Sequence, residues 1–223
     1  MKKYAIIVAG GIGKRMSSEI PKQFLLLNGL PILMHAISQF YNYDKNINLI
    51  IVLPKEQINY WNNLCKEYNF NIKHNVVVGG ETRYVSVKNG LAIVKEKGII
   101  AIHDGVRPLV SYETIDRCFK VAEEKGNAVP FIKVNESLRN ISNKTNIAVN
   151  REEFALIQTP QVFCSNIILN AYKEKYRTEF TDDASLVEFT GEKINLVRGN
   201  EENIKITTQR DILIAEVLSK LGL

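Results

Sequence analysis

The chain has 223 residues, of which 45% are hydrophobic and 24% are charged. This balance excludes a disordered chain, a fibrous protein and a small disulfide scaffold, and the length suits one α/β domain, since domains commonly hold roughly 100 to 200 residues and single sheets often exceed that. The three cysteines, Cys65, Cys118 and Cys164, are odd in number and far apart in the sequence. They therefore favour a reducing cytoplasm over a disulfide framework or a zinc site.

The formal net charge of +5 admits two kinds of partner, a nucleic acid or a small anion. The basic residues are spread singly along the chain, without a basic tail or an arginine-rich stripe. This pattern favours an anionic small molecule and predicts no nucleic-acid partner. The apolar run from Tyr4 to Ala9 is too short for a signal peptide, and no segment approaches the roughly 20 apolar residues of a membrane helix. We expect a soluble cytoplasmic protein with no membrane partner.

Buried strands alternate with helices in the first half of the chain. Tyr4 to Ala9 is a continuous apolar run, which is typical of a strand buried on both faces of a parallel sheet. Further apolar runs and helical stripes predict strands at 49–53, 76–78 and 99–102 and helices at about 31–40, 58–68 and 82–97. The alternation predicts a doubly wound, mostly parallel, Rossmann-like α/β sheet that binds ligands at the carboxyl ends of its strands.

The second half begins with a polar excursion. From Lys133 to Val149 the chain is rich in Asn and Ser and lacks both a helical and a buried-strand pattern, so we predict an insertion that protrudes from the domain. The patterns that follow predict strands at 154–157, 194–197 and 204–206 and helices at about 167–175, 182–189 and 209–221. Without an internal repeat or linker, residues 1–223 are expected to form a single domain.

A glycine-rich loop, Ala9-Gly10-Gly11-Ile12-Gly13-Lys14-Arg15-Met16, follows the first strand. Three glycines let the backbone approach a ligand and aim its N–H groups at phosphate oxygens. The loop matches neither a Walker A motif nor a dinucleotide fingerprint, and the glycines alone fit a plain turn equally well. Arg15 and Lys22, the latter in Pro21-Lys22-Gln23-Phe24, add two cations beside the loop. They favour a site for a nucleotide triphosphate.

Two later loops carry further candidate residues. Asp104 follows the 99–102 strand and could hold Mg²⁺ against phosphates or simply form a cap or turn. His103 fits a hydrogen-bonded structural histidine better than an acid–base catalyst. Gly80 and Ser86 lie in a loop that could read a base edge or cap a helix.

Near the C-terminus, Thr181-Asp182-Asp183-Ala184-Ser185 has the pattern of a helix start. Lys205, among apolar neighbours, fits either a strand-edge residue or a pocket cation. Recognisable Cys–His, Ser–His, HExxH and paired-carboxylate motifs are missing from the sequence, which suits a nucleophile that needs no activation. A phosphate monoester is such a nucleophile, because its second pKa is roughly 6 and it is therefore already a dianion at pH 7. Lys, Arg and Mg²⁺ then have only to align the groups and stabilise the developing charge.

The motif AGGIGKRM together with PKQF resembles the signature loop of the nucleotidyltransferases that make nucleotide sugars and alcohols. HDGVRP, QTPQ, TDDAS and NIKIT follow in this order over nearly the full chain, which is similar to the 2-C-methyl-D-erythritol 4-phosphate cytidylyltransferases of the non-mevalonate isoprenoid pathway. The resemblance implies transfer of CMP from CTP to 2-C-methyl-D-erythritol 4-phosphate. The products would be 4-diphosphocytidyl-2-C-methyl-D-erythritol and pyrophosphate, and the cofactor would be Mg²⁺.

The resemblance also implies residue roles. Nucleotide binding falls to Ala9, Gly10, Gly11, Gly13, Gly80, Arg83 and Ser86. Catalytic contacts fall to Arg15, Lys22 and Lys205, metal binding to Asp104, and acceptor binding to Ser137, Arg151 and Thr181. The insertion at about 133–149 corresponds to the family's dimerisation arm, a β-arm that reaches over the active site of the neighbouring subunit. A homodimer is therefore expected.

Two departures from the family pattern leave alternatives open. Gly105-Val106 replaces the usual Ala-Ala, and Ser137 stands where threonine is common, so ribitol-5-phosphate cytidylyltransferase remains an alternative, although TDDAS favours the methylerythritol enzyme. A catalytically inactive nucleotide-binding regulator is a further alternative, because a fold does not imply a function. The cations and the aspartate retained together argue against it.

Overall fold

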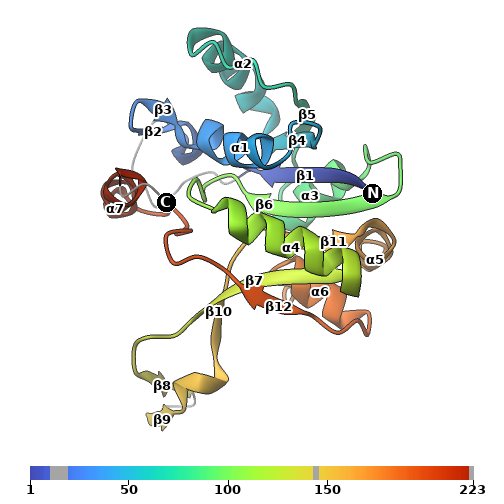
Figure 1. Ribbon diagram of the computed structural model, residues 1–223, viewed down its shortest axis with the longest axis vertical. Coiled ribbons are helices and arrows are strands. Elements are labelled where there is room, and N and C mark those ends of the chain that lie inside the picture. The colour runs from blue at the N-terminus through green and yellow to red at the C-terminus, as the bar shows by residue number, and fades with distance from the viewer. Residues whose placement is uncertain (11–19, 143–145, 221–223) are drawn as a thin grey trace.

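The computed structural model describes residues 1–10, 20–142 and 146–220. Its centre is one sheet with the strand order β10-β7-β11-β6-β1-β4-β5 and with β12 beside β7 (Figure 1). Its strands are β1 (Lys2–Val8), β4 (Asn48–Leu53), β5 (Asn75–Val78), β6 (Gly98–Asp104), β7 (Asn127–Lys133), β10 (Ala155–Ile157), β11 (Gln161–Cys164) and β12 (Leu196–Arg198). Parallel pairing joins β5, β4, β1 and β6, whereas β11 pairs antiparallel with β6 and β7. The prediction of a doubly wound, mostly parallel α/β sheet is confirmed.

Helices cover both faces of this sheet. Successive side chains of a strand point to opposite faces, so Ala5 and Ile7 of β1 belong to one core and Tyr4 and Ile6 to the other. The first core packs against α1 (Ile32–Tyr43), α2 (Ile58–Glu67) and α4 (Tyr112–Lys125). The second packs against α3 (Arg83–Leu91), α5 (Ser165–Ala171) and α6 (Asp183–Phe189). Apolar runs buried on both sides therefore fix the central strands.

A third, smaller core lies beside the sheet. It joins α7 (Gln209–Lys220) to the short hairpin of β2 (Leu26–Leu27) and β3 (Leu30–Pro31). The buried side chains that it shares are Leu27, Ile32, Val106, Ile206, Ile212 and Ala215. Within the described ranges, none of the helices is long and apolar enough to cross a membrane.

Three predicted elements differ from the structure. The helix predicted at about 167–175 is α5, which runs from Ser165 to Ala171. The strand predicted at 204–206 is wrong, because the Ile206 N–H donates to the Val106 carbonyl (2.9 Å), in the loop after β6, and the segment joins no strand ladder. The helix predicted at 82–97 ends at Leu91, since residues 95–97 are exposed and offer the sheet no apolar side chain. The structure also contains α4, β7, β11 and the β2–β3 hairpin, which lie outside the predicted elements.

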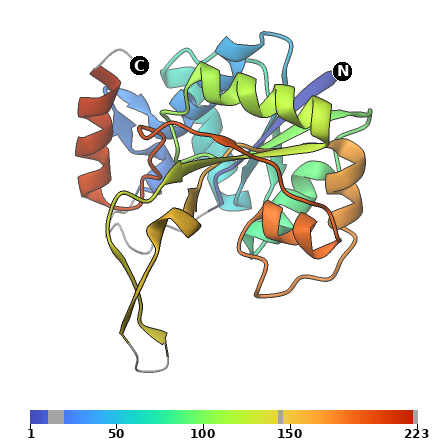
Figure 2. The ribbon, with the colours of Figure 1, turned by 60° about the horizontal axis from the view of Figure 1, so that its bottom comes forward.

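The polar insertion forms a two-stranded hairpin. Its strands, β8 (Leu138–Asn140) and β9 (Ile147–Val149), pair antiparallel from Leu138 opposite Val149. The hairpin extends away from the sheet at the ends of β7 and β10, as both views show (Figures 1 and 2). A single turn, η4 (Arg151–Glu153), returns the chain to β10. The hairpin therefore makes its own ladder away from the central sheet.

Candidate active site

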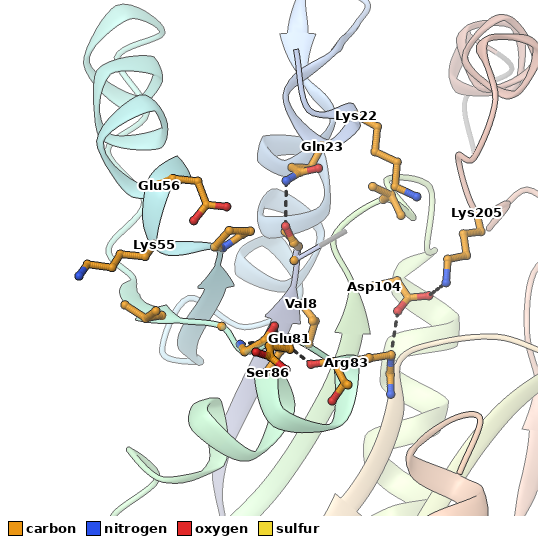
Figure 3. Close-up of a pocket in the computed structure, with 18 of the residues that line it drawn as sticks. Val8, Lys22, Gln23, Lys55, Glu56, Glu81, Arg83, Ser86, Asp104 and Lys205 are labelled. Atoms are coloured by element: carbon orange, nitrogen blue, oxygen red, sulfur yellow. Dashed lines mark hydrogen bonds and ion pairs between the residues drawn. The ribbon is translucent and has the colours of Figure 1, made fainter. Parts of the chain in front are cut away.

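A cavity of about 730 Å³ opens at the carboxyl ends of β1, β4, β5 and β6 (Figure 3). This is the edge at which ligands bind in doubly wound sheets. Its walls come from the loops after these strands, from the single turns η1 (Lys22–Phe24) and η2 (Lys55–Gln57), and from the segment before α7. The polar or charged side chains among its lining residues are Lys22, Gln23, Lys55, Glu56, Glu81, Thr82, Arg83, Ser86, Asp104, Lys205 and Thr207.

The first loop contributes Ala9 and Gly10 to this cavity, while Gly11, Gly13 and Arg15 lie outside the described residues. Gln23 fixes the start of the loop, since its side-chain N–H₂ group donates to the Ala9 carbonyl (2.9 Å) and to Gln57 Oε1 (2.6 Å). Gln23 is only 1% exposed. Lys22, beside it in η1, also lines the cavity. The first strand and the PKQF motif therefore meet at one wall, as the phosphate-site hypothesis requires.

The loop between β5 and α3 is held by its own hydroxyl groups. Thr82 is the N-cap of α3, and its hydroxyl accepts from the Val85 N–H (3.2 Å). The Ser86 hydroxyl accepts from the Gly80 N–H (3.1 Å) and donates to the Thr82 carbonyl (3.0 Å). A Cβ atom at Gly80 would clash with the Val85 side chain, so this position requires glycine. The helix-cap role therefore falls to Thr82, while the Ser86 hydroxyl braces the loop at the cavity wall.

Asp104 ends β6 at the centre of a group of cations. Its carboxylate lies 2.9 Å from Lys205 Nζ and 3.5 Å from Arg83 Nε (Figure 3). It also lies 3.6 Å from Arg107 Nε. Burial opposes its ionisation, but the charges of Arg83, Lys205 and Arg107 outweigh burial and hold the pKa of Asp104 below its ordinary value. Asp104 is therefore a carboxylate at neutral pH. The structure brings Arg83, Asp104 and Lys205 together, as the family resemblance implies for one site.

A second carboxylate, that of Asp183, also contacts Arg83. Arg83 Nη2 donates to Asp183 Oδ2 (2.6 Å), and the Tyr172 hydroxyl donates to Asp183 Oδ1 (2.6 Å). Burial lowers the pKa of Arg83, but the charges of Asp183 and Asp104 outweigh it and the net direction is upward. Burial, followed by the negative charge of Asp183, raises the pKa of Tyr172 well above its usual value. Tyr172 is thus a neutral donor and Arg83 a permanent cation.

His103 is a buried structural residue. Its Nε2 faces the Arg107 carbonyl (2.9 Å) and its Nδ1 faces the Thr159 hydroxyl (3.0 Å). Because a carbonyl only accepts, Nε2 carries the proton and Nδ1 accepts from Thr159. Burial lowers the pKa of His103 to about 4. The ring is neutral and both of its nitrogens are engaged, which agrees with the structural interpretation of this histidine.

Ser137, Arg151 and Thr181 are exposed side chains that do not line the 730 Å³ cavity. Arg151 borders a smaller hollow of about 240 Å³ at the base of the hairpin, with Lys133 as another cation at its wall. Arg151 Nη1 donates to the Asn135 carbonyl (2.5 Å). Within one chain, the structure separates these three residues from the cavity that contains Asp104 and Lys205.

A sequence model of the family described as 2-C-methyl-D-erythritol 4-phosphate cytidylyltransferase (IspD) matches residues 4–220. The chain belongs to this family. A family member from Azobacteroides pseudotrichonymphae is 53% identical over 220 residues, covering 97% of this chain and 98% of the relative. One from Phocaeicola vulgatus is 49% identical over 218 residues, covering 98% and 100%. The family resemblance of the motifs is confirmed.

The fold of this cytidylyltransferase family member also matches solved structures. The crystal structure of 4-diphosphocytidyl-2C-methyl-D-erythritol synthase from Anaerococcus prevotii superposes with a TM-score of 0.83 at 27% identity, covering 98% of each chain. That of 2-C-methyl-D-erythritol 4-phosphate cytidylyltransferase from Thermus thermophilus gives a TM-score of 0.79 at 28% identity, covering 99% of this chain and all of the other. Both similarities extend over nearly the whole length.

Sequence reasoning missed several residues of the cytidylyltransferase site. Gln23 and Arg107 stand inside the PKQF and HDGVRP motifs, beside residues that were singled out, so their motifs contained the signal. Asp183 is different, because its sequence pattern indicates a helix start. In the structure, Asp182 is the N-cap, with a reciprocal hydrogen-bonded pair to Ser185, and Asp183 turns inward to Arg83.

Proposed function

We propose that this chain transfers CMP from CTP to 2-C-methyl-D-erythritol 4-phosphate and releases pyrophosphate. The observation that supports this most strongly is the family match over residues 4–220, together with a cavity that places Gly10, Lys22, Asp104 and Lys205 at one edge of the sheet. All three cysteines are free. This is consistent with a reducing cytoplasm, which stays our expectation for its location.

The reaction makes one bond and breaks one. An oxygen of the acceptor phosphate attacks the α-phosphorus of CTP, and the bond between this phosphorus and the bridging α,β-oxygen breaks, with its electron pair leaving on pyrophosphate. No protein base is needed, because the phosphate monoester is mostly a dianion at neutral pH. We assign to Lys22 and Lys205, with Arg15, the stabilisation of charge that grows on the phosphate oxygens. The backbone at Gly10 approaches the triphosphate.

Asp104 fits a magnesium site of the kind completed by a substrate. The described parts of the chain contain no group of three or more His, Cys, Asp or Glu side chains that could hold a metal by themselves. Mg²⁺ suits such a setting, since it is commonly held by one or two carboxylates plus substrate phosphates and water. We infer that Asp104 holds Mg²⁺, which would neutralise phosphate charge when bound. Arg83, Lys205 and Arg107 keep Asp104 ionised, and because they contact the same carboxylate, Mg²⁺ would bind there only with the negative charge of a bound triphosphate beside it.

The acceptor site is assigned to two subunits. Ser137, Arg151 and Thr181 are the acceptor-binding residues that the family resemblance implies, and all three lie outside the wall of the main cavity. We therefore infer a homodimer in which the hairpin of one subunit brings Ser137 and Arg151 to the cavity of the other. A planar guanidinium such as that of Arg151 can grip a phosphate with two hydrogen bonds.

Pyrophosphate release tests the proposed function. The purified chain is mixed with CTP, Mg²⁺ and either 2-C-methyl-D-erythritol 4-phosphate or ribitol 5-phosphate, and we expect release with the first acceptor at least about tenfold faster at equal concentration, since a mismatched acceptor loses aligned contacts. Preference for ribitol 5-phosphate would contradict the acceptor assignment. Retained CTP binding by calorimetry without release from either acceptor would instead identify an inactive nucleotide-binding protein.

A further inference from the structure

Asp183 is a buried carboxylate that the proposed chemistry does not use. It is 0% exposed, so it cannot touch a substrate in the cavity. Its oxygens are nevertheless fully engaged, because Oδ2 accepts from Arg83 Nη2 and Oδ1 accepts from the Tyr172 hydroxyl, both at 2.6 Å. A charge removed from water is costly unless it is paired and hydrogen-bonded. Asp183 and Arg83 are 100 positions apart in the sequence, so their ion pair links two distant segments of the chain.

The partner of Asp183 lies at the cavity. Arg83 is the first residue of α3, it lines the cavity, and its side chain is 29% exposed. Its Nε lies 3.5 Å from Asp104 Oδ1, so two carboxylates contact the guanidinium, Asp104 at Nε and Asp183 at Nη2. The close-up shows Arg83 extending from α3 towards Asp104 (Figure 3). The orientation of Arg83 at the cavity is therefore set by both neighbours together.

The position of Asp183 is itself well fixed. Asp182 caps α6, with its side chain accepting from the Ser185 N–H (2.8 Å) and its own N–H donating to the Ser185 hydroxyl (3.2 Å). Gln161 of β11 then ties this first turn to the sheet, since it donates to Asp182 Oδ2 (2.6 Å) and accepts from the Ala184 N–H (2.8 Å). The start of α6 is consequently anchored to the sheet from which Asp104 projects.

We propose that Asp183, supported by Tyr172, is a positioning residue that orients Arg83 and, through Arg83, the Asp104 carboxylate for nucleotidyl transfer. This role rests on the proposed function and adds to it a link from α6 to the reacting edge of the sheet. Asp183 acts at a distance from the substrate, because every oxygen of its carboxylate faces protein.

A double-mutant cycle separates positioning from simple support of α6. Asp183→Asn removes the charge that holds Arg83, and we expect kcat to fall at least about tenfold, because small misplacements at a reacting centre are costly, while the KM for CTP stays within about threefold. Arg83→Gln lowers kcat on its own. Since Asp183 acts through Arg83, the double variant should match Arg83→Gln within about threefold. Losses that multiply would contradict the proposal.

Ser185→Ala is the matched control, because it removes the hydroxyl contacts at the same helix start but keeps the Gln161 contacts that tie this turn to the sheet, and it does not touch Arg83. We expect it to lower the melting temperature and to leave kcat unchanged. An Asp183→Asn variant with a lower melting temperature but wild-type kcat would show that Asp183 is only structural. If Asp183→Asn does not fold, Tyr172→Phe takes its place: it keeps the carboxylate and removes one hydrogen bond, so kcat should fall a few-fold in the wild-type background and not at all in Arg83→Gln.

The orientation of Arg83 can also be measured without turnover. In a protein labelled with ¹⁵N-arginine, the Arg83 Nε–H signal, assigned by its loss in Arg83→Gln, should exchange slowly with water in the wild type and in Ser185→Ala. It should exchange faster in Asp183→Asn or Tyr172→Phe. Equal exchange in all of these proteins would overturn the proposal. Because this readout needs no substrate, a failure of the acceptor assignment would leave the test of Asp183 intact.

Discussion

Lys22 and Gln23 are neighbours in the single turn η1, but their side chains serve the cavity differently. Gln23 is 1% exposed and donates to the Ala9 carbonyl. The same peptide carries the Gly10 N–H, and because a trans peptide is planar, fixing its carbonyl also fixes the direction of this N–H. Lys22 lies at the cavity wall with part of its side chain exposed. The Lys22 ammonium at this wall would stabilise the negative charge that grows on the phosphate oxygens during nucleotidyl transfer.

We predict that Lys22→Ala lowers kcat at least about a hundredfold, the scale of losing one preorganised charge donor, with a smaller change in the KM for CTP. Lys55→Ala is the matched control, since Lys55 lies at the same cavity but its ammonium points away from Lys22 and Asp104 (Figure 3). Steady-state kinetics give kcat and the KM for CTP of both variants. An unchanged kcat with a raised KM would mean that Lys22 contributes only uniform binding.

Arg151 offers a prediction about the acceptor. Its guanidinium is exposed, with Nη1 bonded to the Asn135 carbonyl and Nε 3.7 Å from the Glu152 carboxylate. We expect Arg151→Ala to raise the KM for 2-C-methyl-D-erythritol 4-phosphate at least about tenfold, while CTP affinity measured by calorimetry stays within about threefold. Arg151→Lys should recover only part of the loss, because an ammonium cannot reproduce the planar fork.

The control for this measurement is Arg210→Ala, which removes an equal charge from an exposed position on α7. It should leave both constants unchanged. A parallel loss of CTP affinity in Arg151→Ala would place Arg151 at the nucleotide instead of the acceptor.

Site residues whose roles depend on contacts between distant segments of the chain could not be predicted from the sequence. Gly10 and Asp104 could be found because each follows a buried strand, and the carboxyl ends of neighbouring parallel strands share one edge. Asp183 could not, because its role depends on α6 lying beside the start of α3, and the sequence around it specifies only a capped helix. Similarly, nothing in the sequence orients the Ser86 hydroxyl towards the Gly80 N–H.

At the scale of elements, the fully buried strand β6 was predicted, whereas the short strand β11 was not. Every residue of β6 is buried, and its apolar run is unambiguous. β11 has four residues, two of them polar or weakly polar at its ends, so its pattern is too short to separate from a loop. The helix α4 is a different case, since Ile115, Cys118, Phe119 and Ala122 recur at helical spacing between the Ser111 N-cap and Gly126 at φ +90°. The signals for α4 are present in the sequence.

The segment at 204–206 illustrates the opposite error. Ile204 and Ile206 flank Lys205 in an alternating pattern that predicts a strand. Ile206 is indeed buried in the core shared with α7, but its neighbour is the loop that contains Val106, so backbone pairing stops at one hydrogen bond. Alternation reports which side chains are buried. It does not report whether a partner strand lies alongside.

The contact between α2 and the segment before β5 depends on the protonation of His74. Trp61 Nε1 donates to His74 Nε2 (3.0 Å), and His74 Nδ1 lies 2.7 Å from the Ile72 carbonyl. The indole N–H can only donate and the carbonyl can only accept, so the ring is neutral with its proton on Nδ1. Burial lowers the pKa of His74, although the hydrogen bond to Ile72 opposes this shift. A second proton would place two N–H groups face to face.

We predict that acid weakens the fold through this contact. The unfolded chain protonates this histidine at about pH 6.5, above the pKa in the folded chain, so unfolding takes up protons and the free energy of unfolding falls as the pH drops below that value. Urea unfolding between pH 7.5 and 5.5, followed by the fluorescence of Trp61, the one tryptophan of the chain, measures this free energy of unfolding. His74→Gln should reduce this dependence without abolishing it, because the buried His103, whose pKa is also lowered, contributes over the same pH range. Equal pH slopes in the two proteins would exclude a contribution from His74.

At the scale of the whole molecule, exposed apolar side chains gather at the hairpin and at its base. Ile141 is 78% exposed and Ile147 is 59% exposed on the hairpin, and Leu156 of β10 is 52% exposed. Figure 2 shows the hairpin reaching beyond the rest of the molecule. Apolar surface collected on a protruding element is typical of an interface between subunits. The exposed acceptor candidates Ser137 and Arg151 lie on or beside the same hairpin.

The final prediction concerns this hairpin. Replacing residues 135–150 with a short glycine–serine turn should leave the sheet intact, because in the described parts of the chain β8 and β9 pair only with each other. It should convert a dimer into a folded monomer. CTP binding should persist, since the described residues of the main cavity lie outside the deleted segment, while turnover with the acceptor should be lost. Light scattering gives the oligomeric state and calorimetry gives CTP affinity. Ile141→Ser with Ile147→Ser is a milder variant that keeps Ser137 and Arg151, and we expect it to weaken the dimer and lower turnover together. A wild-type protein that is monomeric and active at assay concentration would refute both the dimer and the shared acceptor site.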